Sequence, residues 1–220
     1  MIIRYVAEIR ITPNPRFIDS RGTIIEKLLS RDLQKWQFSN DRIEVHGSNG
    51  FVFFTIQNLG FFSKEKPISY IEHMKIALDI LGERQALRWG FRAYTYIPTK
   101  RKFSTLLNKY KTQLLNYPSS RIKNMNGDLT DVGLTYIFKH EHNRYKIFTG
   151  PMEKEQAKEI FVEDAMPSTG IFIDLDVYRE KGDFYGADDR PSRVLEFLRQ
   201  SLVESEKIIK NWEGIINEGG

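Results

Sequence analysis

Asp174 and Asp176 are the residues whose type and spacing could support metal chemistry. They stand two positions apart in residues 169–178, where apolar side chains alternate as in a β-strand, so both carboxylates share one face. Two such carboxylates can hold Mg²⁺ or Mn²⁺ beside a phosphate, as in two-metal phosphoryl-transfer sites. Such sites normally need a third acid, which the sequence does not identify, and Arg88 or Arg92 can instead pair with the aspartates. We therefore predict no metal and no other cofactor, and keep the two aspartates as the candidate ligands should a metal bind.

A second candidate site lies in residues 84–127, which contain ten Lys or Arg residues and no Asp or Glu. Residues 1–83 contain 11 basic and 10 acidic residues, and residues 128–220 contain 12 and 19, so the net charge of +4 hides a basic middle and an acidic C-terminal part. Charge asymmetry of this kind is informative about binding partners. The residues predicted to bind an anion or a nucleic acid are Lys100, Arg101, Lys102, Lys109, Lys111, Arg121 and Lys123.

Lys100, Arg101 and Lys102 would crowd the first turn of the next helix if that helix, predicted at about residues 102–115, began as early as Thr99. Unpaired N–H groups and the helix dipole favour anions at that end, so basic residues there reduce stability unless they bind an anion such as phosphate. Alternatively, the basic residues pair with the acidic C-terminal part, within the fold or across a dimer, or are simply solvated. Under the first interpretation the partner is nucleic acid or an acidic protein surface.

Other kinds of site find little support in the sequence. His140 and His142 flank Glu141, but two ligands at an exposed turn make a poor zinc site. The chain has no Cys, which excludes thiolate ligands, disulfides and a Cys nucleophile. It also lacks a Gly-rich phosphate loop, a Gly-x-Ser-x-Gly elbow and a His-Glu-x-x-His helix. No catalytic residue can be named, and the sequence favours a protein that is not an enzyme.

The composition is that of an ordinary folded protein, with 40% hydrophobic residues, 15 Phe, 10 Tyr and 3 Trp among 220 residues. This length suits one large domain better than two independent ones. Residues 2–11 alternate between charged and apolar, unlike a signal or transit peptide. The longest uncharged run, residues 47–63, contains Ser, Asn, Gln and Gly and does not suit a membrane span. We expect a cytoplasmic protein with no membrane partner.

Periodicity and turn residues define the expected elements. Strands are predicted at residues 2–12, 35–38, 42–46, 51–57, 86–97, 129–139, 145–149 and 169–178. Helices are predicted at residues 19–29, 68–81, 102–115, 151–162 and 189–217. In the second helix, Ser69 and Glu72 have the spacing of a capping box, and Gly82 stands where a C-cap glycine belongs.

The last predicted helix has a single apolar seam, formed by Leu195, Leu198, Leu202, Ser205, Ile209, Trp212 and Ile216. Residues that step by three and four in this way share one side of a helix. The seam is expected either to dock on the sheet or to be shared with a second subunit. The second arrangement would be a homodimer through the C-terminal helix.

In chain order the elements read β-α-β-β-β-α, then β-α-β-β-α, then β-α, which indicates an α+β protein. We predict two similar β-α-β-β-α halves, each ferredoxin-like, on a shared antiparallel sheet with a long C-terminal helix. The chain would form a single compact domain. Its halves would span about residues 1–84 and 85–180, followed by the C-terminal helix at residues 189–217.

Two of the predicted strands and the final helix also carry a resemblance. Residues 86–94 read Ala-Leu-Arg-Trp-Gly-Phe-Arg-Ala-Tyr, and residues 170–178 read Gly-Ile-Phe-Ile-Asp-Leu-Asp-Val-Tyr. With the long C-terminal helix, these runs resemble a sporadically distributed family of uncharacterised prokaryotic proteins. That family often has a His within the last helix, and residues 199–204 have none, so the chain would be a divergent member. The resemblance implies no activity and no functional residue.

Two functions of different classes follow from these observations. The first is a non-enzymatic binding or scaffolding protein whose basic central surface takes nucleic acid or an acidic protein. The alternative is a metal-dependent phosphate-handling enzyme that uses Asp174 and Asp176. Basic residues that face solvent on one surface would favour the first function, and a cleft with three converging carboxylates would favour the second. Charges that serve self-assembly alone would make the protein an interaction module.

Overall fold

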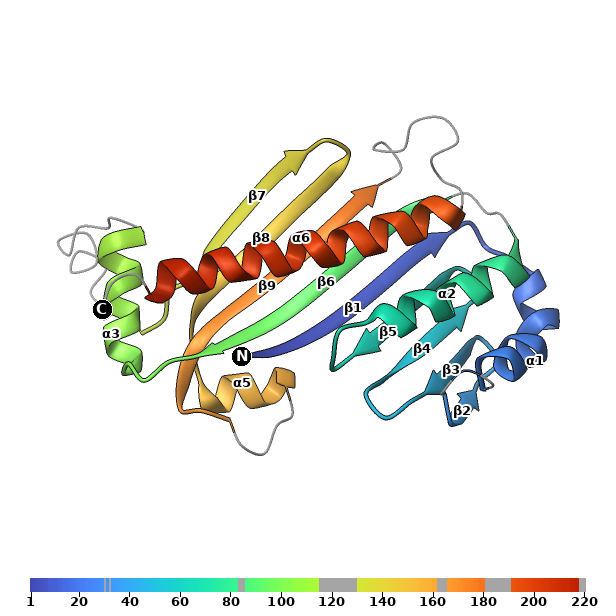
Figure 1. Cartoon of the computed structure of the whole chain (residues 1–220), viewed down its shortest axis with the longest axis horizontal. Coiled ribbons are helices and arrows are strands. Elements are labelled where there is room, and N and C mark those ends of the chain that lie inside the picture. Colours follow the sequence, from blue (N-terminus) through green and yellow to red (C-terminus); the bar gives the residue numbers. More distant parts are fainter. Residues whose placement is uncertain are drawn as a thin grey trace.

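The computed structural model describes residues 1–29, 31, 33–82, 86–114, 130–161, 166–180 and 191–217. Their strands form one nine-stranded antiparallel sheet with helices on its faces (Figure 1). The strands are β1 (Ile2–Ile11), β2 (Lys35–Phe38), β3 (Arg42–His46), β4 (Gly50–Thr55), β5 (Asn58–Ser63), β6 (Ala86–Pro98), β7 (Leu134–His140), β8 (Asn143–Glu153) and β9 (Thr169–Glu180). The helices are α1 (Arg16–Leu29), α2 (Ile68–Leu81), α3 (Phe103–Lys109), the π-helical turn η1 (Tyr110–Leu114), α5 (Lys154–Phe161) and α6 (Pro191–Asn217).

Apart from the edge strand β2, which has no counterpart, the order of the strands is symmetrical about the central β1–β6 pair. The spatial order is β2-β3-β4-β5-β1-β6-β9-β8-β7. Moving outward from the centre, β5, β4 and β3 lie beyond β1, and β9, β8 and β7 lie beyond β6 in the same way. The α+β class and the antiparallel sheet are thus confirmed. The ferredoxin-like character of each half is not confirmed, because β1 pairs with β5 on one side and with β6 of the other half on the other side.

Alternation along the central strands gives the sheet two different faces. Tyr5, Ala7 and Ile9 of β1 are buried on one face, with Trp89 and Phe91 of β6 beside them. We call this the closed face, because α1, α2, α3 and α6 all pack on it. Large apolar side chains there each stabilise the fold by roughly 1.5–3 kcal/mol when fully buried. One continuous core cluster joins both halves of the sheet.

Helix α6 lies across the closed face and runs diagonally over β6 and β9 (Figure 1). Its 27 residues correspond to about 40 Å of helix. The seam predicted from the sequence is buried at Leu195, Leu198, Leu202, Ser205 and Ile209. The seam therefore docks on the sheet of its own chain, and a homodimer through this helix would need its outer side. None of the described helices is long and apolar enough to cross a membrane.

Helix α5 is the one described helix on the opposite face, where it covers one end of the sheet. Ala157 and Phe161 of α5 pack with Tyr96 of β6 and Phe172 of β9 in a separate small core. Arg4 of β1 is 4% exposed and donates a hydrogen bond of 3.2 Å to the carbonyl of Phe161, the last residue of α5. A cation at a helix C-terminus is electrostatically favourable, so Arg4 fastens α5 to the sheet.

Residues 58–63 correct the predicted strand pattern. Alternation in the sequence predicts one strand at residues 51–57, whereas the structure has β4 and β5 joined by a tight turn. The Thr55 hydroxyl makes this turn by accepting hydrogen bonds from the backbone N–H groups of Gln57 and Asn58. A threonine side chain here takes the place of the glycine or proline that usually marks a turn.

The ends of α2 confirm one capping prediction and correct the other. Gly82 is the C-cap, with φ of 74°, a region that glycine enters without the penalty of a Cβ. Its N–H bonds to the carbonyl of Leu78. The helix begins at Ile68 with Pro67 as N-cap and no side-chain cap, so Ser69 already lies inside the first turn and does not form a capping box.

Candidate binding site on the open face of the sheet

Most charged residues of the strands lie on the face opposite the closed face. We call it the open face, because α5 is the only described helix that packs on it. Alternation and register place nine Lys or Arg residues on it against five Asp or Glu. The basic residues are Arg4, Arg10, Lys35, Arg42, Arg88, Arg92, Lys139, Arg144 and Lys146, and the acidic ones are Glu8, Glu44, Asp174, Asp176 and Glu180. This face is therefore basic.

Asp174 and Asp176 point onto the open face and pair with arginines of β6. The Arg88 guanidinium donates to Asp176 Oδ2 over 2.9 Å, and Arg92 donates two hydrogen bonds to Asp174, one of them 2.6 Å long from Nε to Oδ1. These ion pairs confirm the arginine partners that the sequence suggested. No group of three His, Cys, Asp or Glu side chains suited to a metal is found among the described residues.

Two glycines leave space on this face on either side of Glu8. In the register of the sheet, Glu8 of β1 lies between Gly60 of β5 and Gly90 of β6. A Cβ added at Gly90 would lie 2.6 Å from Nη1 of Arg88, so the missing side chain lets the guanidinium lie flat on the strand. Arg88 can then reach past Gly90 toward Asp176, which stands opposite Arg92 rather than opposite Arg88. The glycine thus determines where the positive charge lies.

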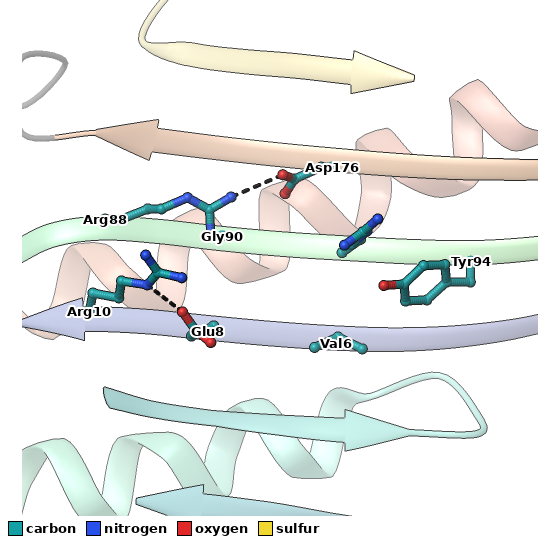
Figure 2. Close-up of a pocket in the computed structure, with 8 residues that line it drawn as sticks. Val6, Glu8, Arg10, Arg88, Gly90, Tyr94 and Asp176 are labelled. Carbon is teal, nitrogen blue, oxygen red and sulfur yellow. Dashed lines mark hydrogen bonds and ion pairs between the residues drawn. The ribbon is translucent and has the colours of Figure 1, made fainter. Parts of the chain in front are cut away.

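A shallow hollow of about 270 Å³ opens above Gly90 (Figure 2). Its floor is the sheet at Gly90 and Val6. Its walls carry three guanidinium groups, two carboxylates and one phenol, from Arg10, Arg88, Arg92, Glu8, Asp176 and Tyr94. A space of this size suits a small charged group, such as a phosphate, better than a large apolar ligand.

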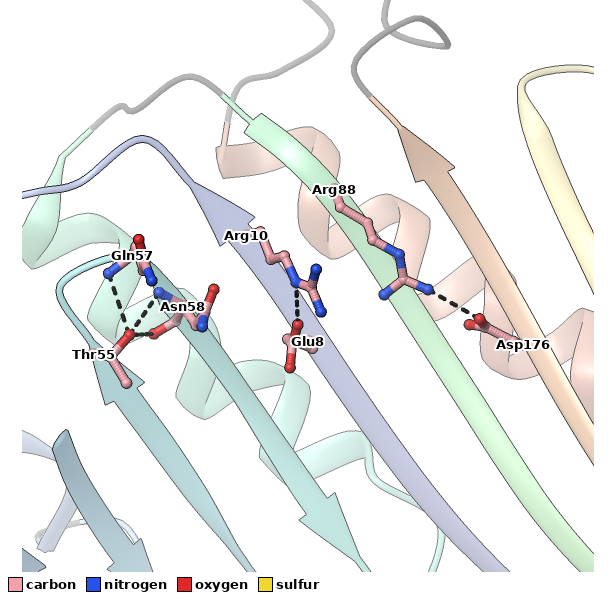
Figure 3. Close-up of polar contacts among 7 residues, drawn as sticks. All are labelled: Glu8, Arg10, Thr55, Gln57, Asn58, Arg88 and Asp176. Carbon is pink, nitrogen blue, oxygen red and sulfur yellow. Dashed lines mark hydrogen bonds and ion pairs between the residues drawn. The ribbon is translucent and has the colours of Figure 1, made fainter.

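Two of the arginines at this hollow are directly opposite each other. Arg10 of β1 and Arg88 of β6 are register partners on neighbouring antiparallel strands. Like charges in that position lower the stability of a sheet. Each guanidinium is held by a carboxylate beside it: Arg10 Nε donates to Glu8 over 2.5 Å, and Arg88 bonds to Asp176 (Figure 3). Both arginines line the hollow, and each guanidinium has further N–H groups besides the one bonded to its carboxylate.

Burial governs the protonation of the groups around the hollow. It raises the pKa of the Asp176 carboxyl above its ordinary value, and Arg88 and Arg92 offset this only in part. The hydrogen bond with Asp174 raises the pKa of Arg92, which stays a cation. Burial also raises the pKa of the Tyr94 phenol, which stays neutral and lies under the Arg92 guanidinium, 4.6 Å from the ring centre. The hollow therefore offers fixed positive charge and hydrogen-bond donors.

The basic residues predicted as the anion site lie away from this hollow. Lys100, Arg101 and Lys102 follow the end of β6, and the ten residue steps from Arg88 to Pro98 span about 33 Å of strand. Lys102 is the N-cap of α3 rather than part of its first turn. None of the three makes an ion pair with a described residue.

The remaining members of that predicted set divide in two. Lys109 and Lys111 are half-buried on α3 and η1, which pack on the closed face through Tyr110, whose hydroxyl bonds to Thr149. Arg121 and Lys123 lie outside the described residues, as does Arg84. His140 and His142 stand at the exposed tip of the β7–β8 hairpin and join no metal-binding group among the residues described.

Sequence reasoning missed Arg10, Glu8 and Gly90. One signal was present: Arg4, Glu8 and Arg10 alternate with apolar residues in β1, which puts them on one face. The other was the glycine inside a strand, which often marks a close approach to the backbone. The sequence does not predict that these residues lie side by side, because this depends on the register between β1 and β6, which pairs residues almost 80 positions apart.

Both acidic side chains of the hollow are paired with arginines. Among the described residues of the hollow, no nucleophile stands beside a base.

In comparisons with known proteins, no family model and no curated protein matches the chain.

Proposed function

We propose that this protein is a non-enzymatic binding protein that holds a nucleic acid on the open face of its sheet, with a phosphate group in the hollow above Gly90. The observation that carries this proposal is the placement of Arg10 directly opposite Arg88, beside Arg92. A phosphate bound between the two guanidiniums would relieve their repulsion, because guanidinium and phosphate form paired, charge-assisted hydrogen bonds.

The charge of the whole face supports the same function. Without Arg4, which is buried under α5, eight basic side chains stand against five acidic ones on the open face, and this excess attracts a polyanion beyond one phosphate. The same charge opposes face-to-face packing of two copies of the chain. An acidic protein surface would satisfy the charge as well, and it is the competing outcome of the experiment below.

The alternative of a metal-dependent phosphate-handling enzyme stays a prediction. Its two candidate ligands, Asp174 and Asp176, are held by Arg92 and Arg88. A metal would have to displace those guanidiniums, and no third acid of the described residues joins the pair. Family membership and a homodimer also stay predictions. The symmetrical strand order supports the proposal that the two halves are copies of one unit.

The test compares two surfaces by charge removal. Fluorescence anisotropy would follow a labelled single-stranded oligonucleotide over a range of salt concentrations. We expect Arg10→Gln with Arg88→Gln to weaken binding at least tenfold and to lower the salt slope by roughly one, as lost phosphate contacts do. The matched control is Lys207→Gln with Lys210→Gln, two exposed residues of α6 on the other side of the molecule.

A third pair, Lys100→Gln with Arg101→Gln, examines the surface predicted from the sequence. If only this pair weakens binding, the nucleic acid lies at the β6–α3 connection and the open-face proposal is wrong. If the unmodified protein does not change the anisotropy of the oligonucleotide at low salt, nucleic-acid binding is contradicted altogether. An acidic protein would then become the better candidate for the partner.

A further inference from the structure

Three phenylalanines gather on the open face in the N-terminal half. Phe51 and Phe53 belong to β4 and Phe62 to β5, and their positions in the register turn them away from the closed face. All three are half-buried, whereas Val52, Phe54 and Phe61, which alternate with them, are fully buried on the closed face. No described helix covers these three rings.

The rings form a contact group of their own. Phe51 and Phe62 are stacked, with ring centres 5.8 Å apart and planes inclined by 26°, and Phe53 lies 6.4 Å from Phe51. Arg42 of β3 places its guanidinium 4.6 Å from the centre of the Phe53 ring. His46, also of β3, lies 5.2 Å from Phe51, measured between ring centres. The cluster thus combines aromatic faces with the Arg42 guanidinium, which pairs with Glu44 over 2.7 Å.

Gly60 allows the Phe53 ring of this cluster to lie directly on the backbone of the sheet. A Cβ at Gly60 would lie 2.6 Å from the Phe53 ring, so that ring rests on the bare backbone of β5. Gly60 in turn is the register partner of Glu8, which borders the arginine hollow. Strands β4 and β6 are three steps apart in the sheet, which is about 14 Å. The aromatic cluster and the arginine hollow therefore adjoin on one surface.

From this arrangement we infer that the ligand is single-stranded nucleic acid, with bases stacked on the Phe51–Phe53–Phe62 cluster and the backbone phosphates at Arg10, Arg88 and Arg92. The inference rests on the proposed function and adds the class of nucleic acid to it. Aromatic side chains beside a basic groove are the usual means of binding single strands, because every base has a face that can stack. A duplex keeps its base faces stacked internally and offers this cluster only its backbone and groove edges.

The charge and the aromatic rings of the open face favour single-stranded nucleic acid over two other ligands, a second copy of the chain and a polyanion without bases. A second copy of the chain would bring the same basic face into contact with itself. A polyanion without bases, such as polyphosphate, would use the arginines and gain nothing from the rings. The rings and the arginines together thus specify a ligand that carries both phosphates and aromatic bases.

The deciding experiment uses three probes with the full chain: an oligothymidylate single strand, a duplex of mixed sequence and inorganic polyphosphate. We expect Phe51→Leu with Phe62→Leu to weaken binding of the single strand at least fivefold and to leave polyphosphate binding unchanged. Phe62→Tyr, which keeps a ring, should retain binding. Phe38→Leu is the matched control, since Phe38 is 61% exposed on the edge strand β2 and lies on the closed-face side.

The outcomes distinguish this inference from the proposed function. Binding of single strand, duplex and polyphosphate with equal affinity, unchanged by the leucine pair, would overturn the stacking cluster and leave anion binding intact. Binding of none of the three probes would instead remove the proposed function. Loss of polyphosphate binding in the leucine pair would show a general disturbance of the face and would also overturn the inference.

Discussion

The two halves of the sheet share a strand order but present different chemistry on the open face. In the N-terminal half, β4 and β5 carry the rings of Phe51, Phe53 and Phe62. In the C-terminal half, β6 and β9 carry the ion pairs of Arg88 and Arg92. On the closed face both halves are apolar and contribute to one core. The difference indicates that packing dictates one face of each strand, while the other is free to acquire a ligand.

The junction between the halves gives the largest predicted effect. Phe91 of β6 is fully buried and contacts Tyr5 of β1 at 6.0 Å and Phe61 of β5 at 6.4 Å, measured between ring centres. Phe91→Ala should lower the free energy of unfolding by about 3–5 kcal/mol. We expect one cooperative transition at a lower urea midpoint, by circular dichroism and tryptophan fluorescence alike. Two separate transitions would show that the halves fold independently.

The two glycines beside Glu8 give a second contrast. A Cβ at Gly60 would lie 2.0 Å from the carbonyl oxygen of Ala7, so Gly60→Ala must move the β1 or β5 backbone and should cost about 1–3 kcal/mol. At Gly90 the nearest atom is the movable end of Arg88, so Gly90→Ala should change stability by less than about 1 kcal/mol. Gly90→Ala should still weaken anion binding, because Arg88 is displaced. Urea midpoints and anisotropy measure the two effects, and equal losses of stability would contradict the comparison.

Asp176 of β9 should make the stability of the protein depend on pH. Because burial raises the pKa of Asp176, its charged form is less favourable in the folded state, so this group's contribution to stability is lost as the pH rises through the folded-state pKa. Asp176→Asn should therefore cost little at pH 7, and its stability relative to the unmodified protein should fall as the pH is lowered.

Asp174→Asn is the matched variant and should cost about 1–2 kcal/mol at pH 7, because it breaks the two-bond pairing with Arg92. Urea unfolding of both variants between pH 4 and pH 8 checks the pair of expectations. A greater loss for Asp176→Asn than for Asp174→Asn at pH 7 would show that the ion pair with Arg88 outweighs the cost of burial.

The smallest effect is expected at a hairpin. In the N-terminal half, β3 and β4 are joined through Gly47, Ser48 and Asn49, whereas the equivalent β7–β8 turn consists of Glu141 and His142. Glu141 has φ of 51°, which glycine adopts at lower cost. Glu141→Gly should raise stability by about 0.5 kcal/mol, seen as a small increase in Tm. His142→Gly is the control and should lower it, since positive φ is not required there.

Local patterns predicted the elements well because alternation and helical periodicity depend on near neighbours. The α6 seam and the pairing of Asp174 and Asp176 with Arg88 and Arg92 were readable from strand faces and opposite charge. Strand β5 was missed because its turn is closed by a threonine hydroxyl instead of a glycine or proline.

The candidate site was less readable than the elements. Clustering along the chain singled out Lys100 and its neighbours, but a strand as long as β6 carries them far from Arg88. Arg10 joins Arg88 only through the pairing of two strands that are distant in sequence. A charge count along the chain therefore located the basic strand and missed the surface to which its arginines belong.

The central position of β1 has a consequence for how the chain folds. Its neighbours β5 and β6 follow it by roughly 50 and 80 residues, so the middle of the sheet can close only after long loops have formed. Sheets dominated by such distant pairings fold slowly, and strands that wait with one apolar face exposed are prone to mispair. Three charged residues lie on the other face of β1, namely Arg4, Glu8 and Arg10. They keep that face hydrated until β1 has paired with its neighbours. Arg10, which we assign to the ligand, thus has a second role with Arg4 and Glu8 in limiting aggregation during folding.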